Sequence, residues 1–282
     1  MAAPSVDDRL QARIDALTDA IREIGPLVVA FSGGVDSALL TVAAARALGP
    51  DKVLAATADS ASLGSGELAT CRRLTSGWGV DWVAVSTDEL ADERYLANDT
   101  DRCYWCKSAL MDQLEPLATE RGATVALGVN VDDLGDHRPG QQAAGDRGAR
   151  FPLVEAGLTK DDIRALARHW DVEVWDRPAM PCLSSRIPYG TAVTVPLLSR
   201  IDRAEAAVRA LGFSDLRVRH YGDTARIELP RHEMVQAVER SEELVAAVTG
   251  AGYRYATLDL AGLRSGNLNH VVEVAAEPIA GR

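Results

Sequence analysis

The sequence predicts an α/β protein with a doubly wound parallel sheet, followed by a second, smaller α+β domain. Over the first 190 residues, short apolar runs alternate with helical patterns, as in consecutive βαβ units. After residue 190 the order changes to helix, two strands, helix and strand, with a Gly-Asp turn between the two strands. We therefore expect domains at 1–190 and 191–282.

The elements of the first domain follow from the spacing of apolar residues. Leu10, Ile14, Leu17 and Ile21 recur at helical spacing and predict an amphipathic helix over 6–24. The same reading predicts strands at 26–31, 52–57, 82–85, 124–128 and 151–154, and helices at 38–48, 67–78, 107–121 and 159–170. The helix over 67–78 contains Cys71, expected to be a packing residue. Residues 135–150 are polar and glycine-rich, which predicts a mobile loop.

The second domain is expected to contain helices at 197–211 and 231–248 and strands at 216–221, 225–229 and 253–260. Arg217 and Arg219 lie two residues apart, so their side chains share one face of a strand. Beside Glu205 and Glu228, they would suit the phosphate of a substrate nucleotide. A solvated hairpin face with cross-strand ion pairs fits the pattern equally well.

Composition excludes several classes of protein. The chain is 47% apolar and 25% charged, which is ordinary for a globular protein. Its net charge of -11 argues against DNA binding and disfavours tRNA. No signal peptide or long apolar run is visible, so we expect a cytoplasmic protein without a membrane segment. Four cysteines are too few for a disulfide scaffold.

The hexapeptide Ser32-Gly33-Gly34-Val35-Asp36-Ser37 lies between the first strand and its helix. Backbone N–H groups of such a turn and the helix dipole form an anion site, and the glycines allow close approach. Asp36 would repel phosphate alone, which suggests that Mg²⁺ shares the site. The Lys-Ser/Thr of a Walker A loop is absent.

Polar residues also follow the second and fourth strands. Asp59 and Ser60 end the second strand, and acidic residues cluster with Arg138 in the stretch 128–140. Because parallel strands end at one edge of a sheet, these groups would face the hexapeptide. By composition alone, a solvated acidic loop is favoured over a ligand site for the stretch 128–140.

The hexapeptide resembles the pyrophosphate loop of the ATP pyrophosphatase (PP-loop) superfamily, SGGxDS. Four further stretches extend the similarity to the LarE family, ATP-dependent sulfur transferases of nickel-pincer cofactor biosynthesis. They are Asp101 to Ser108, the Gly-x-Asn-x-Asp-Asp-x-x-Asp-x-Arg-Pro-Gly stretch from Gly128, Pro181 to Arg186, and Leu258 to Asn269.

The resemblance implies an adenine nucleotide alpha hydrolase-like fold and a homo-oligomer, such as a hexamer. It implies that ATP and Mg²⁺ adenylate pyridinium-3,5-biscarboxylic acid mononucleotide, and that a sulfur then replaces AMP. Cys182 matches the position that donates sulfur, becoming dehydroalanine in the sacrificial version. The residues that would bind ATP are Ser32, Gly33, Gly34, Asp36, Ser37, Asp59, Ser60, Gly128, Asn130, Asp133, Arg138 and Arg186.

Cys103 and Cys106 form a C-x-x-C motif and leave the source of sulfur open. With Cys182 they would hold three irons of a [4Fe–4S] cluster, whose fourth iron carries an extra sulfide in related enzymes. A zinc site, a redox or persulfide relay, and structural thiols are the alternatives. Trp105, between the two cysteines, would stack on a pyridinium ring unless it is a core residue.

Three other functions share the hexapeptide. A tRNA thiolation enzyme needs an RNA-binding module, which is not visible in the sequence. An amide-forming synthetase needs an ammonia source and gives Cys182 no role. A nucleotide-sensing module would bind ATP without releasing pyrophosphate, and the intact Asp36 argues against it.

Overall fold

The computed structural model describes residues 6–135, 139–213 and 215–264. They form two compact units. The first comprises residues up to Tyr95 together with Asp101–Met180, and the second comprises Leu96–Thr100 and the residues from Pro181 onward. The domain bounds 1–190 and 191–282 stay a prediction.

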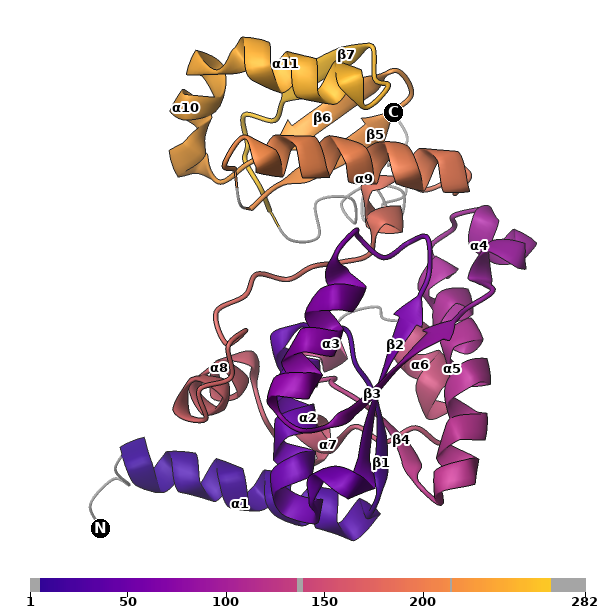
Figure 1. Ribbon diagram of the computed structural model, residues 1–282, viewed down its shortest axis with the longest axis vertical. Coiled ribbons are helices and arrows are strands. Elements are labelled where there is room, and N and C mark those ends of the chain that lie inside the picture. The colour runs from indigo at the N-terminus through magenta and orange to yellow at the C-terminus, as the bar shows by residue number, and fades with distance from the viewer. Residues whose placement is uncertain (1–5, 136–138, 214, 265–282) are drawn as a thin grey trace, which may run out of the picture. The chain divides into compact units, whose positions relative to one another are not determined.

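The first unit contains a four-stranded parallel sheet in the order β3-β2-β1-β4, which confirms the predicted α/β class (Figure 1). The strands are β1 (Leu27–Ala30), β2 (Val53–Asp59), β3 (Asp81–Ser86) and β4 (Thr124–Leu127). The helices are α1 (Val6–Ile24), α2 (Val35–Leu48), α3 (Glu67–Gly77), α4 (Glu93–Leu96), α5 (Arg102–Arg121), α6 (Pro139–Gly145), α7 (Pro152–Glu155) and α8 (Lys160–His169).

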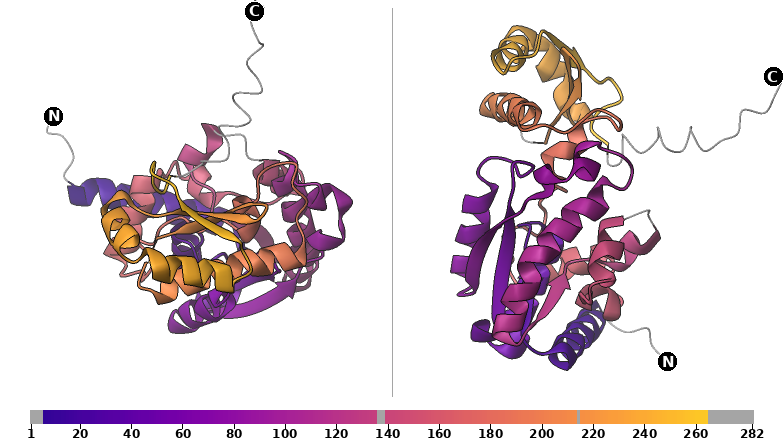
Figure 2. Two further views of the ribbon diagram at one scale, coloured as in Figure 1. Left: turned by 90° about the horizontal axis from the view of Figure 1, so that it is seen from above. Right: turned by 90° about the vertical axis from the view of Figure 1, so that its right-hand side faces the viewer.

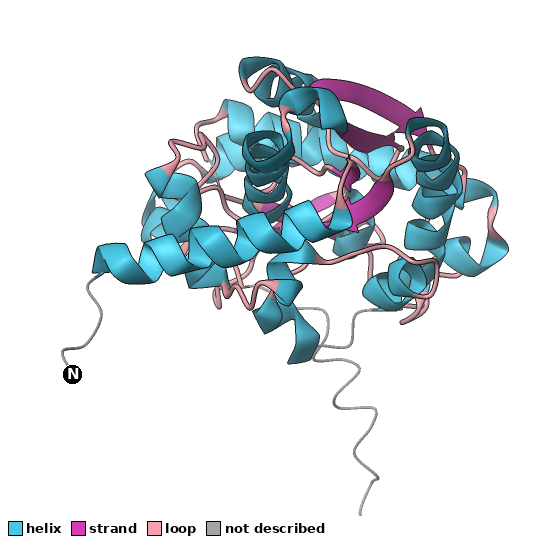
Figure 3. Ribbon diagram, turned by 90° about the horizontal axis from the view of Figure 1, so that it is seen from below, coloured by secondary structure: helices cyan, strands magenta, loops and turns pink. Residues whose placement is uncertain are grey.

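Two hydrophobic cores cover the two faces of this sheet, because successive strand side chains point to opposite faces. On β1, Leu27 and Val29 join the core that contains the apolar residues of α1, α2 and α8. Val28, between them, joins the core formed with Leu110, Met111 and Leu114 of α5. Helices therefore lie on both sides of the strands (Figures 2 and 3).

Two predicted features of the first unit are wrong. Residues 151–154 are not a strand, because Pro152 at the first helical position favours the one-turn helix α7. Residues 139–145 are not a mobile loop but the helix α6. Gly140, Ala143 and Ala144 are buried, and a Cβ on Gly140 would lie 2.9 Å from the Cys103 carbonyl oxygen of α5. Small side chains therefore let α6 pack closely on α5.

Helix boundaries also differ from the prediction. α2 begins at Val35 rather than 38, and α5 begins at Arg102 rather than 107, so the C-x-x-C motif lies within a helix. The helix expected over 231–248 is broken into α10 (Met234–Glu239) and α11 (Ser241–Gly250), which meet at Arg240.

The second unit has the helix-strand-strand-helix-strand order that the sequence predicts. Its remaining elements are the short 3₁₀ helix η4 (Leu183–Arg186), α9 (Val195–Ala210), β5 (Arg217–Tyr221), β6 (Thr224–Glu228) and β7 (Tyr255–Leu258). β5 and β6 form the expected antiparallel hairpin, and β7 adds to β6 in parallel. Among the described residues, no helix is both long and apolar enough to span a membrane.

The segment 96–100 adds to the second unit from a distant part of the sequence. Asn98 is fully buried, and its amide donates hydrogen bonds to the carbonyl oxygens of Pro188 and Thr191, at 2.8 and 2.9 Å. The Asn98 carbonyl in turn accepts from the Gly190 N–H, and the Leu96 carbonyl accepts from the Val193 N–H. The stretch 187–193 is therefore held by a segment that lies about 90 residues earlier in the chain.

Candidate nucleotide and thiol sites

The hexapeptide forms a tight turn between β1 and α2. Gly33 has a φ of +74°, in the left-handed region that favours glycine. Gly34 is the N-cap of α2 and supplies no side-chain cap to the first N–H groups of this helix, while its own N–H donates to the Ser32 hydroxyl at 3.4 Å. The Ser32 and Ser37 hydroxyl oxygens lie 3.2 Å apart, and the Ser37 hydroxyl donates to the Gly34 carbonyl at 3.1 Å. The turn has the form of an anion site.

Asp36 lies in the first turn of α2 and contacts the loop after β4 and the start of α8. Its Oδ2 accepts a hydrogen bond from Lys160 Nζ at 2.5 Å, and its Oδ1 accepts one from Asn130 Nδ2 at 3.2 Å. Lys160 was not identified from the sequence. Its only sequence signal is its place as the first residue of a helix capped by Thr159. The site therefore holds both a carboxylate and an ammonium group.

The loop after β4 approaches the hexapeptide, and its Asp132 and Asp133 carboxylates bind backbone groups. Asp133 accepts from the Asn130 N–H at 3.2 Å, and Asp132 accepts from the Lys160 N–H at 2.7 Å. These bonds order the loop around Asn130 and explain part of its acidic composition without a ligand. Arg138 lies outside the described residues.

Gly128 lies close against the hexapeptide. A Cβ there would lie 2.7 Å from the Ser37 nitrogen and 2.8 Å from the Asp36 carbonyl carbon, both backbone atoms. We expect Gly128→Ala to lower the free energy of unfolding by about 1–3 kcal/mol and to displace Asp36. Urea unfolding measures the first effect. Gly77→Ala is the matched control, because Gly77 has nothing within 4 Å of a Cβ. Equal stability of the two variants would contradict the close approach.

Ser60 follows β2, and its hydroxyl donates a hydrogen bond to the carboxylate of Glu89. Glu89 is 1% exposed. It was not identified from the sequence, because there it resembles any acidic residue of a loop. Asp59 ends β2 with an exposed side chain. The two residues therefore lie in different environments, and their contact with a nucleotide stays a prediction.

Cys182 is exposed and is the N-cap of η4, in the second unit. The Arg186 Nη1 donates to the carbonyl oxygens of Pro181 and Cys182, at 2.5 and 3.0 Å, and to the Ser185 hydroxyl at 3.0 Å. The backbone on which Cys182 lies is thus held by a guanidinium group, while its thiol remains accessible.

Arg186 forms a buried ion pair with Glu205 of α9. The side chains are 2% and 1% exposed, and the two groups make paired N–H···O bonds of 2.8 and 3.1 Å. Burial opposes ionisation of Glu205, but the charge and hydrogen bonds of Arg186, helped by the Val218 N–H and Arg209, outweigh it and lower its pKa. Since these bonds occupy every Arg186 nitrogen, its contact with a phosphate stays a prediction.

Glu205→Gln leaves Arg186 without its buried counter-charge. We expect a loss of about 3 kcal/mol in the free energy of unfolding at pH 7, measured by urea unfolding. Because the folded pKa of Glu205 is lowered, its contribution is present at neutral pH and is lost as the pH falls through that pKa. The loss caused by the variant should therefore shrink in acid. Glu243→Gln breaks the exposed pair of Glu243 with Arg240, the N-cap of α11, and should cost far less, because solvent screens these charges. Equal losses in the two variants would contradict this account.

The arginines of the hairpin lie in a cluster of charges rather than on a solvated face. Arg219 is 6% exposed and pairs at 2.9 Å with the fully buried Glu228, which also binds Arg226. Burial, followed by the charge of Arg186, lowers the pKa of Arg217 to about 10. Cross-strand ion pairs are therefore present as one sequence interpretation expected, but most of the cluster is buried. Its contact with a substrate phosphate stays a prediction.

Cys103 and Cys106 lie one turn apart near the start of α5, where residues three apart are neighbours. They belong to the first unit and Cys182 to the second. Among the described residues, no group of three or more His, Cys, Asp or Glu side chains is arranged to hold a metal ion. Cys71 is fully buried in the core of the first unit, which confirms its predicted packing role.

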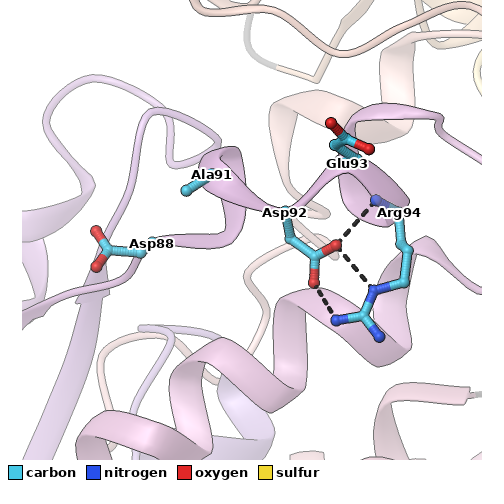
Figure 4. A pocket seen from close by; sticks show the side chains of 5 residues that line it. All are labelled: Asp88, Ala91, Asp92, Glu93 and Arg94. Carbon is cyan, nitrogen blue, oxygen red and sulfur yellow. Dashed lines mark hydrogen bonds and ion pairs between the residues drawn. The ribbon is translucent and has the colours of Figure 1, made fainter.

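Trp105 binds a cation within its own unit. The Arg94 guanidinium lies 3.5 Å from the centre of its ring, and the indole N–H donates to Asp101 at 2.9 Å. Asp92 accepts two hydrogen bonds from the Arg94 guanidinium, and Asp92 and Arg94 both line a surface hollow (Figure 4). The hollow contains none of the predicted site residues.

Comparison with known proteins identifies the family. No family model matches the chain. An uncharacterized protein of Synechocystis sp. is 43% identical over 266 residues, which cover 93% of this chain and 99% of the relative. An uncharacterized protein of Methanocaldococcus jannaschii is 22% identical over 240 residues, or 85% and 91% of the two chains. The pyridinium-3,5-bisthiocarboxylic acid mononucleotide synthase of Lactiplantibacillus plantarum is 35% identical over 260 residues, or 92% and 94%. By this similarity the chain belongs to the family of that synthase, the LarE family.

Proposed function

We propose that this protein is an ATP-dependent sulfur transferase that converts pyridinium-3,5-biscarboxylic acid mononucleotide to its thiocarboxylate. The observation that carries the proposal is an accessible Cys182 thiol in a chain that also has an intact pyrophosphate loop. A name that contains bisthiocarboxylic acid, on a relative similar over nearly its whole length, supports the same substrate class. Neither a binding module nor an amide-forming synthetase gives Cys182 a role.

The first half-reaction activates a carboxylate. An oxygen of that carboxylate attacks the α-phosphorus of ATP, the bond to the bridging oxygen breaks, and pyrophosphate leaves. The N–H groups of the Ser32–Ser37 turn and the Lys160 ammonium supply positive charge to the phosphates. Asp36 and nearby oxygen groups such as Asn130 are the hard ligands that Mg²⁺ prefers, and would hold the ion, which offsets phosphate charge when bound.

The second half-reaction introduces sulfur. The Cys182 thiolate attacks the activated carbonyl carbon, and AMP leaves as the C–O bond breaks. Loss of the Cα proton and cleavage of the Cβ–S bond then release the thiocarboxylate and convert Cys182 to dehydroalanine. Atoms and electrons balance without an oxidant or reductant, and each chain acts once. Arg186 holds the carbonyl of Cys182 and so orients the backbone that carries the thiol.

Cys103 and Cys106 allow a version of the reaction in which the protein turns over repeatedly instead of acting once. Thiolates are the usual ligands of iron–sulfur clusters, and two on one helical turn fit part of such a site, with Cys182 as the third ligand. A bound [4Fe–4S] cluster would carry a free sulfide taken up from solution and replaced after each turnover, so the protein sulfur would be spared.

The first experiment measures iron and acid-labile sulfide on protein purified without oxygen, beside Cys103→Ser. Pyrophosphate release and thiocarboxylate formation are then followed on the same samples by mass spectrometry. About four irons per chain, lost in Cys103→Ser, would assign the sulfur to a cluster. An iron-free protein that turns Cys182 into dehydroalanine would assign it to the cysteine. A protein that forms no thiocarboxylate from ATP and the dicarboxylate under either condition would overturn the proposed function.

A further inference from the structure

Arg177 contacts the backbone of the Ser32–Ser37 turn at the Gly33 carbonyl. The sequence gave no indication that Arg177 belongs to the site. Its Nη1 donates a hydrogen bond to the Gly33 carbonyl at 3.2 Å. Its Nη2 donates to both carboxylate oxygens of Glu67, the first residue of α3, at 2.8 and 3.0 Å. The Arg177 and Glu67 side chains are 21% and 13% exposed, so this pair is largely shielded from solvent.

The contact falls on the peptide that is easiest to reorient in the loop. Gly33 has a positive φ and no side chain, so steric clashes exclude few other backbone conformations at this residue. Because the peptide is trans, the Gly33 carbonyl and the Gly34 N–H point in opposite directions. A donor that holds the carbonyl on the Arg177 side therefore aims the Gly34 N–H away from Arg177, where it donates to the Ser32 hydroxyl at 3.4 Å.

A second group limits the same glycine. A Cβ built on Gly33 would lie 3.0 Å from Cys71 Sγ and 3.5 Å from Arg177 Nη1. Cys71 is one turn beyond Glu67 on α3 and is fully buried. The Cys71 thiol and the Arg177 guanidinium therefore both lie next to Gly33. Cys71 belongs to α3, and Arg177 is held by Glu67 of the same helix. Glu67 balances the charge of Arg177, so the contact contributes geometry more than charge to the loop.

We propose that Arg177 is a positioning residue for ATP: by holding the Gly33 carbonyl it fixes the loop N–H groups in the orientation that binds the phosphates. The inference rests on the proposed use of ATP by this loop. It does not depend on the source of sulfur.

The structure offers a matched control on the same helix. Arg73 of α3 also makes two hydrogen bonds to a carboxylate, that of Glu173, but this pair is 58% and 59% exposed. Glu173 lies only four residues before Arg177 in the sequence. Arg73→Met therefore removes the same kind of side chain and ion pair from the same region and leaves Gly33 untouched.

The test measures the dissociation constant of Mg-ATP by calorimetry and, separately, kcat and KM for ATP in pyrophosphate release. We expect Arg177→Met to weaken ATP binding about tenfold and to lower kcat/KM about 100-fold, because small misplacements of reacting groups are costly. Arg177→Lys should restore part of the loss, since one ammonium group can reach Gly33 or Glu67 but cannot reproduce the planar fork. Arg73→Met should match the wild type in both measurements.

A merely structural role would lower kcat through loss of active protein and leave the ATP dissociation constant and KM unchanged, which would overturn the inference. If Arg177→Met fails to fold, Glu67→Gln loosens the same guanidinium without removing it and should weaken ATP binding about threefold. No change in that variant would also count against the inference. If the wild type binds ATP but releases no pyrophosphate, the proposed reaction is wrong. The ratio of the Mg-ATP dissociation constants of Arg177→Met and the wild type still tests the role of Arg177.

Discussion

Replacing Cys182 with alanine is expected to abolish thiocarboxylate formation while pyrophosphate release continues. The thiol is the sulfur donor or a cluster ligand in the proposed reaction, and neither role survives its removal. Arg186 holds backbone carbonyls on this loop rather than the thiol, so alanine should leave the loop in place. In the proposed reaction, adenylation depends on Asp36, Lys160 and the glycine turn, which belong to the other unit.

Mass spectrometry of the nucleotide product and a coupled assay for pyrophosphate separate the two half-reactions in this variant. Cys182→Ser controls for the polar side chain and should also fail to transfer sulfur, because a serine attack would place oxygen on the carbonyl. Thiocarboxylate made at the wild-type yield by Cys182→Ala would remove Cys182 from the reaction.

Replacing Asp36 with alanine is expected to lower the rate of pyrophosphate release by about 100-fold or more, an effect typical of a lost electrostatic contact in an active site. Asp36 is the carboxylate at the start of α2, and it holds both Lys160 and Asn130. Its removal takes away a proposed Mg²⁺ ligand and leaves the Lys160 ammonium without its partner. Both changes alter the charge that the triphosphate meets.

The measurement is the initial rate of pyrophosphate release over a range of Mg²⁺ concentrations, with Asp161→Asn as the control. Asp161 follows Lys160 in α8 and is exposed, so its charge is lost near the site without a change in the contacts of Asp36. Asp36→Asn keeps the size of the side chain and should be nearly as slow as the alanine variant. A near-normal rate in Asp36→Ala would show that the metal is held elsewhere.

Local pattern was enough to predict much of the fold and the turn around Gly33. Leu27, Val28 and Val29 are all buried, as the central strand of a parallel sheet requires, and the strand–glycine–helix order dictates where the turn lies. The helix α6 escaped prediction because its small residues, such as Ala143 and Ala144, pack on α5 without producing a strong apolar pattern. Tertiary packing, rather than local preference, makes that segment helical.

The partners of the site residues were harder to predict because they come from remote parts of the chain. Lys160 lies 124 residues from Asp36, and Arg177 lies 144 residues from Gly33. On a sequence, each resembles an ordinary surface cation. The buried pair of Arg186 and Glu205 is similar, since nothing local shows that either charge is removed from water.

The contribution of the segment 96–100 to the second unit affects how this protein can be divided by genetic engineering. A gene fragment that begins at Pro181 would encode most of that unit but would lack Asn98, whose amide serves the carbonyl groups of Pro188 and Thr191. The complementary fragment would carry Asn98 without those acceptors. Neither half is a self-contained cassette for transfer to another enzyme, and exchange of this module between homologues must carry both pieces of chain.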